Sequence, residues 1–138
     1  MDRKKKTDFR KGGGTFLEFS VTSLFLITFL MVIVGLFIKR YTIENINLAA
    51  DQLSRDVVVC ESFDEAEDII EERKQIFLDL TYVTDIDIQL DYMLGGNAEW
   101  HKGNYIQISY YVKLDSTLTL NESDYYTVIT KMIENSGN

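Results

Sequence analysis

The chain has 138 residues, of which 22 are acidic and 14 basic, and its formal net charge is −8. An acidic chain repels the phosphate backbone, which argues against nucleic acid as a partner. The single cysteine excludes an internal disulfide. With one histidine and no phosphate loop, nucleophile elbow or metal-ligand cluster, the sequence predicts neither an enzyme nor a cofactor or metal site.

The N-terminal region changes character three times within forty residues. Met1–Lys11 is basic, Gly12–Gly14 follows, and Phe19–Ile38 is an uncharged apolar stretch. A helix rises about 1.5 Å per residue, so this stretch spans roughly 30 Å, the thickness of a bilayer's hydrocarbon core. Its few hydroxyl side chains can bond back to helix carbonyls. The pattern predicts one transmembrane helix over residues 19–38.

The charges on either side of this stretch predict its orientation. Met1–Lys11 has an excess of Lys and Arg, whereas residues 41–138 are strongly acidic. Lys39 and Arg40 oppose this asymmetry but are outnumbered by the leader. Basic residues beside a membrane helix stay in the cytoplasm. We therefore predict a single-pass protein of the cytoplasmic membrane, with its N-terminus in the cytoplasm and its C-terminal module outside.

The residues around the glycines suggest a processing site. No small-residue cleavage motif follows the apolar stretch, so removal of the whole segment is not expected. The small residues precede it: Gly13 and Gly14 lie shortly before Glu18 and Phe19. In this order the segment resembles a prepilin-type (class III) signal, and the Glu-Phe pair is similar to that of the TadE-like minor pilins of Tad (tight adherence) pilus systems. The resemblance covers about residues 11–56 and, more loosely, the rest.

The resemblance implies a specific maturation. A prepilin peptidase would cut after Gly13, Gly14 would become the N-terminus, and Glu18 would be the fifth residue of the mature chain. Three consecutive glycines leave the cut open by one residue either way, but only this cut makes Glu18 the fifth residue. The resemblance further implies that Glu18 pairs with the N-terminal amine of a neighbouring pilin-like subunit, as part of an oligomer or hetero-assembly. It thus implies a minor subunit or assembly factor of a bacterial pilus that serves cell adhesion.

An alternative stays open from the residues themselves. A charge inside a membrane helix costs about 2.5–3.5 kcal/mol at its centre and less near an interface, so Glu18 can also lie solvated among the headgroups. The glycines would then be a flexible joint. The protein would be an uncleaved, signal-anchored extracytoplasmic binding or regulatory subunit.

The helix is expected to continue beyond the membrane as a stem. An apolar seam of alternating three- and four-residue spacing follows Arg40, as in a helix that packs along one side. The seam residues are Ile43, Ile46, Ala50, Leu53 and Val57, and the pattern extends to Cys60. Two partners are possible for this seam: the stems of other subunits, or the protein's own C-terminal module. Cys60 is interpreted as a buried thiol, with an intermolecular disulfide as the alternative.

The remaining residues predict a small α+β module. A capping box at Ser62 and Glu65 starts a second helix that ends near Leu80. Alternation of apolar and polar residues then predicts two long strands of a hairpin, within residues 85–92 and 106–114. Residues 125–133 are ambiguous between strand and helix, with strand favoured by β-branched and aromatic content. Residues 134–138 are expected to fray.

The predicted organisation is thus a basic leader (1–13), a transmembrane helix with stem (14–60) and an extracytoplasmic module of one helix on two or three antiparallel strands (61–138). Trp100 is predicted to be a plug over the sheet, with an exposed contact as the alternative. Tyr105 and Tyr111 share its polar face and form a possible contact patch.

Overall fold

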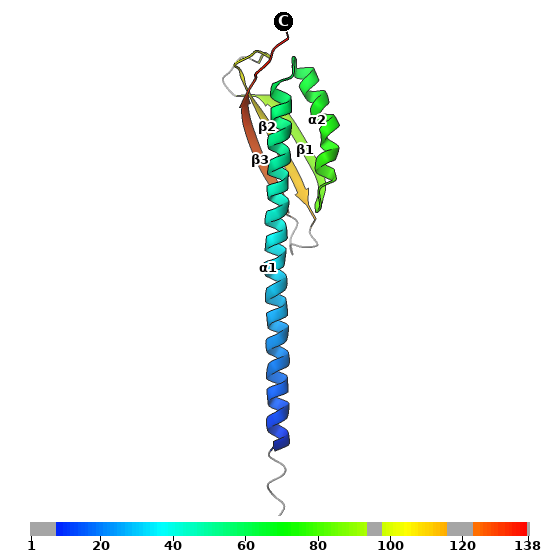
Figure 1. The fold of residues 1–138 in the computed structure, drawn as a ribbon, viewed down its shortest axis with the longest axis vertical. Helices are drawn as coiled ribbons and strands as arrows, with labels where there is room; N and C mark the ends of the chain where they lie inside the picture. Colours follow the sequence, from blue (N-terminus) through cyan, green and yellow to red (C-terminus); the bar gives the residue numbers. More distant parts are fainter. Residues whose placement is uncertain (1–7, 94–97, 116–122, 138) are drawn as a thin grey trace, which may run out of the picture. The chain divides into compact units, whose positions relative to one another are not determined.

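The computed structural model describes residues 8–93, 98–115 and 123–137, with the backbone alone for residues 8–13. The chain divides into two compact units, Met1–Phe37 and Ile38–Asn138. Two helices precede a three-stranded sheet, in the order α1, α2, β1, β2, β3 (Figure 1). The fold is α+β, as predicted.

Helix α1 (Asp8–Val58) begins inside the basic leader, ahead of the predicted start of the helix at residue 14. The glycines are therefore helical in backbone, and the chain contains no proline that would end the helix there. Each glycine costs a helix about 1 kcal/mol relative to alanine, so this turn is intrinsically weak. The hydroxyls of Ser20, Thr22 and Thr28 donate to the carbonyl four residues earlier, at 2.8–2.9 Å, as the membrane interpretation expects.

Helix α2 (Phe63–Leu78) has the predicted cap at its start and ends slightly earlier than expected, with Asp79 as C-cap. The Ser62 hydroxyl accepts from the Glu65 amide at 3.2 Å. The Glu65 carboxylate reaches back to the amide of Glu61 at 2.7 Å, one residue before the usual capping-box partner. Two amides at the helix start are thus satisfied by side chains.

The sheet consists of β1 (Val83–Tyr92), β2 (Tyr105–Leu114) and β3 (Ser123–Met132), in the order β1-β2-β3 with antiparallel neighbours. The predicted hairpin is present, with Ile88 opposite Tyr110. The ambiguous C-terminal segment is a strand, as its composition favours. Strands β1 and β3 are the two edges of the sheet.

One face of the sheet forms the core of the C-terminal unit. Ile106, Ile108, Tyr110 and Val112 of β2 are at most 1% exposed. Helix α2 lies against β1, and the last turns of α1 contact β2 and β3 (Figure 1). Among the described residues no helix covers the other face. It carries Tyr105, Tyr111 and Tyr126, each more than 40% exposed.

Residues 134–137 are bonded to the end of α1 and to Glu61, so the prediction that they fray is wrong; residue 138 lies outside the described residues. The amides of Glu134 and Asn135 donate to the carbonyl of Val58 at 2.8 and 3.3 Å, and the Asn135 side chain donates to Val59 O at 3.1 Å. Ile133 is fully buried. The last carbonyls of a helix lack partners within the helix, and the tail supplies them for α1.

Candidate functional site

The first candidate site is the N-terminal part of α1. In the described part of the chain, α1 is the one helix that is long and apolar enough to span a membrane. Its most apolar 18 residues have a mean hydropathy of 2.7. Phe16, Leu17 and Phe19 are 66–72% exposed, and most apolar side chains from Val21 to Phe37 are 51–77% exposed. No other part of the described chain covers this surface, and a lipid or subunit environment would cover it.

Gly14 and Glu18 are one helical turn apart on this surface. Residues separated by four positions lie on the same side of a helix. The Glu18 side chain is exposed, and a Cβ added at Gly14 would meet no atom within 4 Å. Packing within the chain therefore does not require glycine at position 14. Gly13 lies in the helix, but for this residue the structure describes the backbone alone.

The predicted seam packs on the protein's own module. Ile46, Ala50 and Val57 are fully buried and Leu53 is 3% exposed, while Ile43 is packed at the border of the same core. The sequence left two possible partners for the seam, the stems of other subunits and the protein's own module. In the structure the seam packs on the module. The seam is consequently not a free surface for other subunits.

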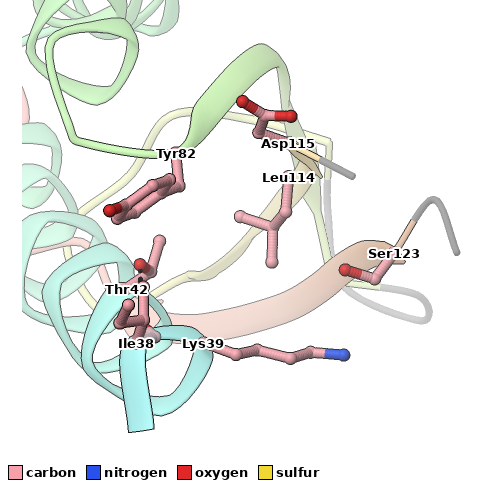
Figure 2. A pocket seen from close by; sticks show the side chains of 7 residues that line it. All are labelled: Ile38, Lys39, Thr42, Tyr82, Leu114, Asp115 and Ser123. Carbon is pink, nitrogen blue, oxygen red and sulfur yellow. Dashed lines mark hydrogen bonds between the residues drawn. The ribbon is translucent and has the colours of Figure 1, made fainter. Parts of the chain in front are cut away.

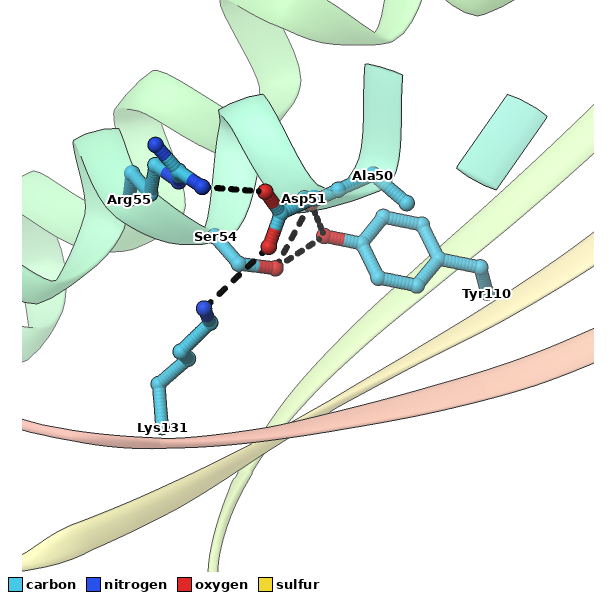
Figure 3. A network of polar contacts seen from close by, with 6 residues as sticks. All are labelled: Ala50, Asp51, Ser54, Arg55, Tyr110 and Lys131. Carbon is cyan, nitrogen blue, oxygen red and sulfur yellow. Dashed lines mark hydrogen bonds and ion pairs between the residues drawn. The ribbon is translucent and has the colours of Figure 1, made fainter. Parts of the chain in front are cut away.

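A polar network joins α1 to the sheet (Figure 3). The Ser54 hydroxyl donates to Ala50 O at 2.7 Å, the Tyr110 hydroxyl donates to the same carbonyl at 3.0 Å, and the two hydroxyl oxygens lie 2.9 Å apart. Two hydroxyl protons serve these three contacts. Beside them, the Asp51 carboxylate pairs with Arg55 at 2.9 Å and with Lys131 of β3 at 3.1 Å. The bond with Lys131 lowers the pKa of Asp51.

The burial of Tyr110 makes the stability of the C-terminal unit sensitive to alkali. Burial is the main reason that the pKa of Tyr110 rises from 10.0 to about 12. Because the folded pKa is raised, the stabilisation is complete below pH 10 and is lost as the pH rises towards 12. The loss is roughly 3 kcal/mol for a shift of this size. We expect urea unfolding, followed by Trp100 fluorescence, to show this decline in the wild type.

The variant Tyr110→Phe is the control for this prediction. It should cost about 1 kcal/mol at pH 7, for the lost hydrogen bond, and should flatten the decline between pH 10 and 12. Cys60, with a pKa raised by burial to about 11, contributes equally to both proteins. The same alkaline slope in wild type and variant would contradict the assignment to Tyr110.

Cys60 and Trp100 close the far end of the module. Cys60 is 3% exposed and its thiol donates to Asp56 O at 3.4 Å, so it is a buried free thiol rather than an exposed site for an intermolecular disulfide. The Trp100 indole donates to Cys60 O at 2.9 Å, and its ring meets the edge of Phe63 at 6.3 Å. Trp100 thus covers this end, as predicted.

Figure 2 shows a pocket where α1 meets the residue before β1, the end of β2 and the start of β3. Tyr82 points toward α1 there and has φ 69°, a left-handed conformation that is uncommon outside glycine. The cavity volume is about 10 Å³, which leaves room for one water molecule at most. It is lined by Ile38, Lys39, Thr42, Tyr82, Leu114, Asp115 and Ser123. This pocket is too small for an organic ligand.

A larger groove lies between α2 and β1, with a volume of about 310 Å³. The sequence did not single it out, because it depends on how a helix and a strand far apart along the chain pack together. Three acids of α2, Glu67, Asp68 and Glu71, line it. Among the described residues, no three His, Cys, Asp or Glu side chains are grouped so as to hold a metal ion.

Comparison of the chain with protein-family models, with curated proteins and with solved structures found no match.

Proposed function

We propose that this protein is a pilin-related membrane protein, a minor subunit or assembly factor of a Tad-type pilus, matured by a prepilin peptidase. The observation that carries the proposal is the position of Glu18, fifth after Gly13 and directly before an apolar helix. The open space around Gly14 supports it, because small size at that position then serves the peptidase rather than packing within the chain.

The mechanism of the proposal is structural. Cleavage removes the basic leader and gives Gly14 a free α-amino group. The Glu18 carboxylate then pairs with the amine of a neighbouring subunit, so that neither charge remains alone at the border of the membrane. The exposed apolar side chains of residues 16–37 provide the helix surface along which subunits pack.

The buried seam narrows how subunits meet. Because Ile46, Ala50 and Val57 pack on the module, contacts between subunits are confined to the membrane segment and to the outer surfaces of the module. A regulatory subunit could not bind a membrane complex through the seam, because the seam residues are buried against the module. An uncleaved, anchored binding module remains the second candidate, since within the described residues no helix covers one face of the sheet, and β1 and β3 are its edge strands.

Intact mass of the membrane-extracted protein tests the proposal. In cells with an active prepilin peptidase, the mature chain is expected to begin at Gly14. The variant Gly13→Val should remain uncut, whereas Gly12→Ala should be processed. A chain that begins at Met1 in such cells would overturn the proposal and favour the anchored module.

Replacing the carboxylate separates processing from assembly. Glu18→Gln should be inserted and cleaved normally but recovered in pilus fractions about tenfold less, since a loss of 1.4 kcal/mol of pairing energy gives a tenfold change. Cross-linking between subunits in membranes provides a second readout. Glu44→Gln, which also neutralises an exposed acid of α1, is the matched control. Equal recovery of both variants would contradict the pairing.

A further inference from the structure

Strand β1 is an edge strand of the sheet, so every second residue along it directs its backbone N–H and C=O away from β2. Its amide ladder to β2 includes the bond from Met93 N to Tyr105 O at 3.1 Å. In an antiparallel pair, bonded residues alternate with residues whose N–H and C=O point away. Counted back from Met93, the outward groups belong to Ile86, Ile88, Leu90 and Tyr92. The Ile86 amide is bonded to the Asp85 carboxylate at 2.9 Å, so the open stretch begins at Ile88.

The groove beside this edge has an apolar floor. Ile70 of α2 and Leu90 of β1 are nearly buried, and Ile88 is half-buried between them. The volume of about 310 Å³ lies next to the open stretch of the strand. At one end, the stacked rings of Phe63 and Tyr92, 5.2 Å apart, join the helix to the strand. The groove therefore offers backbone partners and apolar contact at the same place.

The α2 side of the groove is acidic, and so is the opposite face of β1. Glu67, Asp68 and Glu71 line the groove from α2. Asp87 and Asp91 stand on the other face of β1, next to its free edge. Lys74 approaches Glu71 only at 3.9 Å, so most of this negative charge is not neutralised from within. Pairing of β1 with β1 of a second copy would bring acids against acids, which excludes the second copy as the occupant.

We propose that this α2–β1 groove binds an extended basic segment of another protein, which adds to β1 as a fourth strand. Its main chain bonds to Ile88 and Leu90. Because side chains alternate along a strand, those that face the floor are apolar and those on the other face are Lys or Arg beside Asp87 and Asp91. The inference does not depend on leader cleavage, so it can fail or hold independently of the pilus proposal.

Peptide binding to the full chain in detergent micelles tests this mode. The probe is acetyl-VKVKVKV-amide, measured by titration calorimetry. The glutamate analogue acetyl-VEVEVEV-amide should not bind. A version of the lysine peptide with alternate amides N-methylated should bind at least tenfold more weakly if main-chain pairing contributes. Equal binding of the methylated and unmethylated peptides, or no binding of the lysine peptide at millimolar concentration, would overturn the proposal.

Two sets of protein variants localise the binding. Asp87→Asn and Asp91→Asn together remove the acids beside the lysines of the proposed mode and should weaken the lysine peptide at least tenfold. The control, with the same change in net charge, combines Glu99→Gln and Glu134→Gln, and should bind like the wild type. An equal loss in both sets means non-specific attraction and overturns the groove assignment. Unchanged Trp100 fluorescence verifies the fold of each variant.

A proline at the edge provides a variant that leaves the charges in place. Proline is tolerated on an edge strand where its missing N–H points outward. Ile88→Pro removes one outward donor and should weaken the lysine peptide as strongly as the charge variants. Full binding by this variant, with its fold intact, would overturn strand addition.

Discussion

Replacing Leu53 by aspartate is expected to abolish the cooperative unfolding transition of the C-terminal unit. Leu53 is 3% exposed and lies with Ile76 and Phe77 of α2 around a small cavity between the two helices. Burial of an unpaired carboxylate costs several kcal/mol, against a total stability of about 5–15 kcal/mol for a domain. Trp100 fluorescence of the purified protein in micelles, followed through a urea titration, measures the effect.

The matched control is Leu48→Asp. Leu48 is on the same helix but is 70% exposed, so a charge there remains in water and the transition should be retained. Both variants should still be extracted with the membrane fraction, because the apolar stretch is unchanged. If Leu53→Asp unfolds like the wild type, the seam does not pack on the module, and a seam between subunits becomes tenable again.

Replacing Phe77 by alanine is expected to lower the free energy of unfolding by about 3–5 kcal/mol. Phe77 is 1% exposed, and its ring lies 5.7 Å from that of Tyr110, so the substitution leaves a cavity between α2 and β2. For a domain of 60–100 residues, each kcal/mol shifts the melting temperature by about 4–8 °C. Thermal melting followed by near-ultraviolet circular dichroism should therefore show a large decrease.

The neighbouring Ile76 is the control for this substitution. Its side chain is 47% exposed, so Ile76→Ala removes little buried surface and should cost less than about 1 kcal/mol. A similar melting temperature for both variants would contradict the core position of Phe77. Together with the Leu53 result, the comparison measures how far α1, α2 and the sheet depend on one another.

Local patterns were sufficient for most secondary structure. Ser62 and Glu65 mark the start of α2 because capping bonds form between residues close in sequence. Alternation placed β1 and β2, because one side of each strand is buried. The predicted start of α1 was wrong. Glycines are unfavourable in a helix, but no proline interrupts the backbone, and the helix therefore continues to Asp8. The tail was also wrong, because its bonds to Val58 join residues that are far apart along the chain.

The candidate sites divide in the same way. The order of Gly13, Gly14 and Glu18 is visible in the sequence, and their cleavage and pairing involve other molecules, so they stay predictions. The contact of Tyr110 with Ser54 joins positions 56 residues apart, and no local pattern indicates it. The α2–β1 groove likewise exists only once a helix and a strand have packed.

By itself, the sequence determined the apolar segment long enough to span a membrane, the register of Glu18 behind the glycines and the α+β succession of elements, because each depends on spacing within one or two turns or strands. Only the tertiary structure decided what the seam of α1 packs against, what completes the last turn of that helix and which edge of the sheet lies open beside an acidic groove. These depend on contacts between distant segments, and the burial of apolar surface that stabilises such contacts has no direction along the chain.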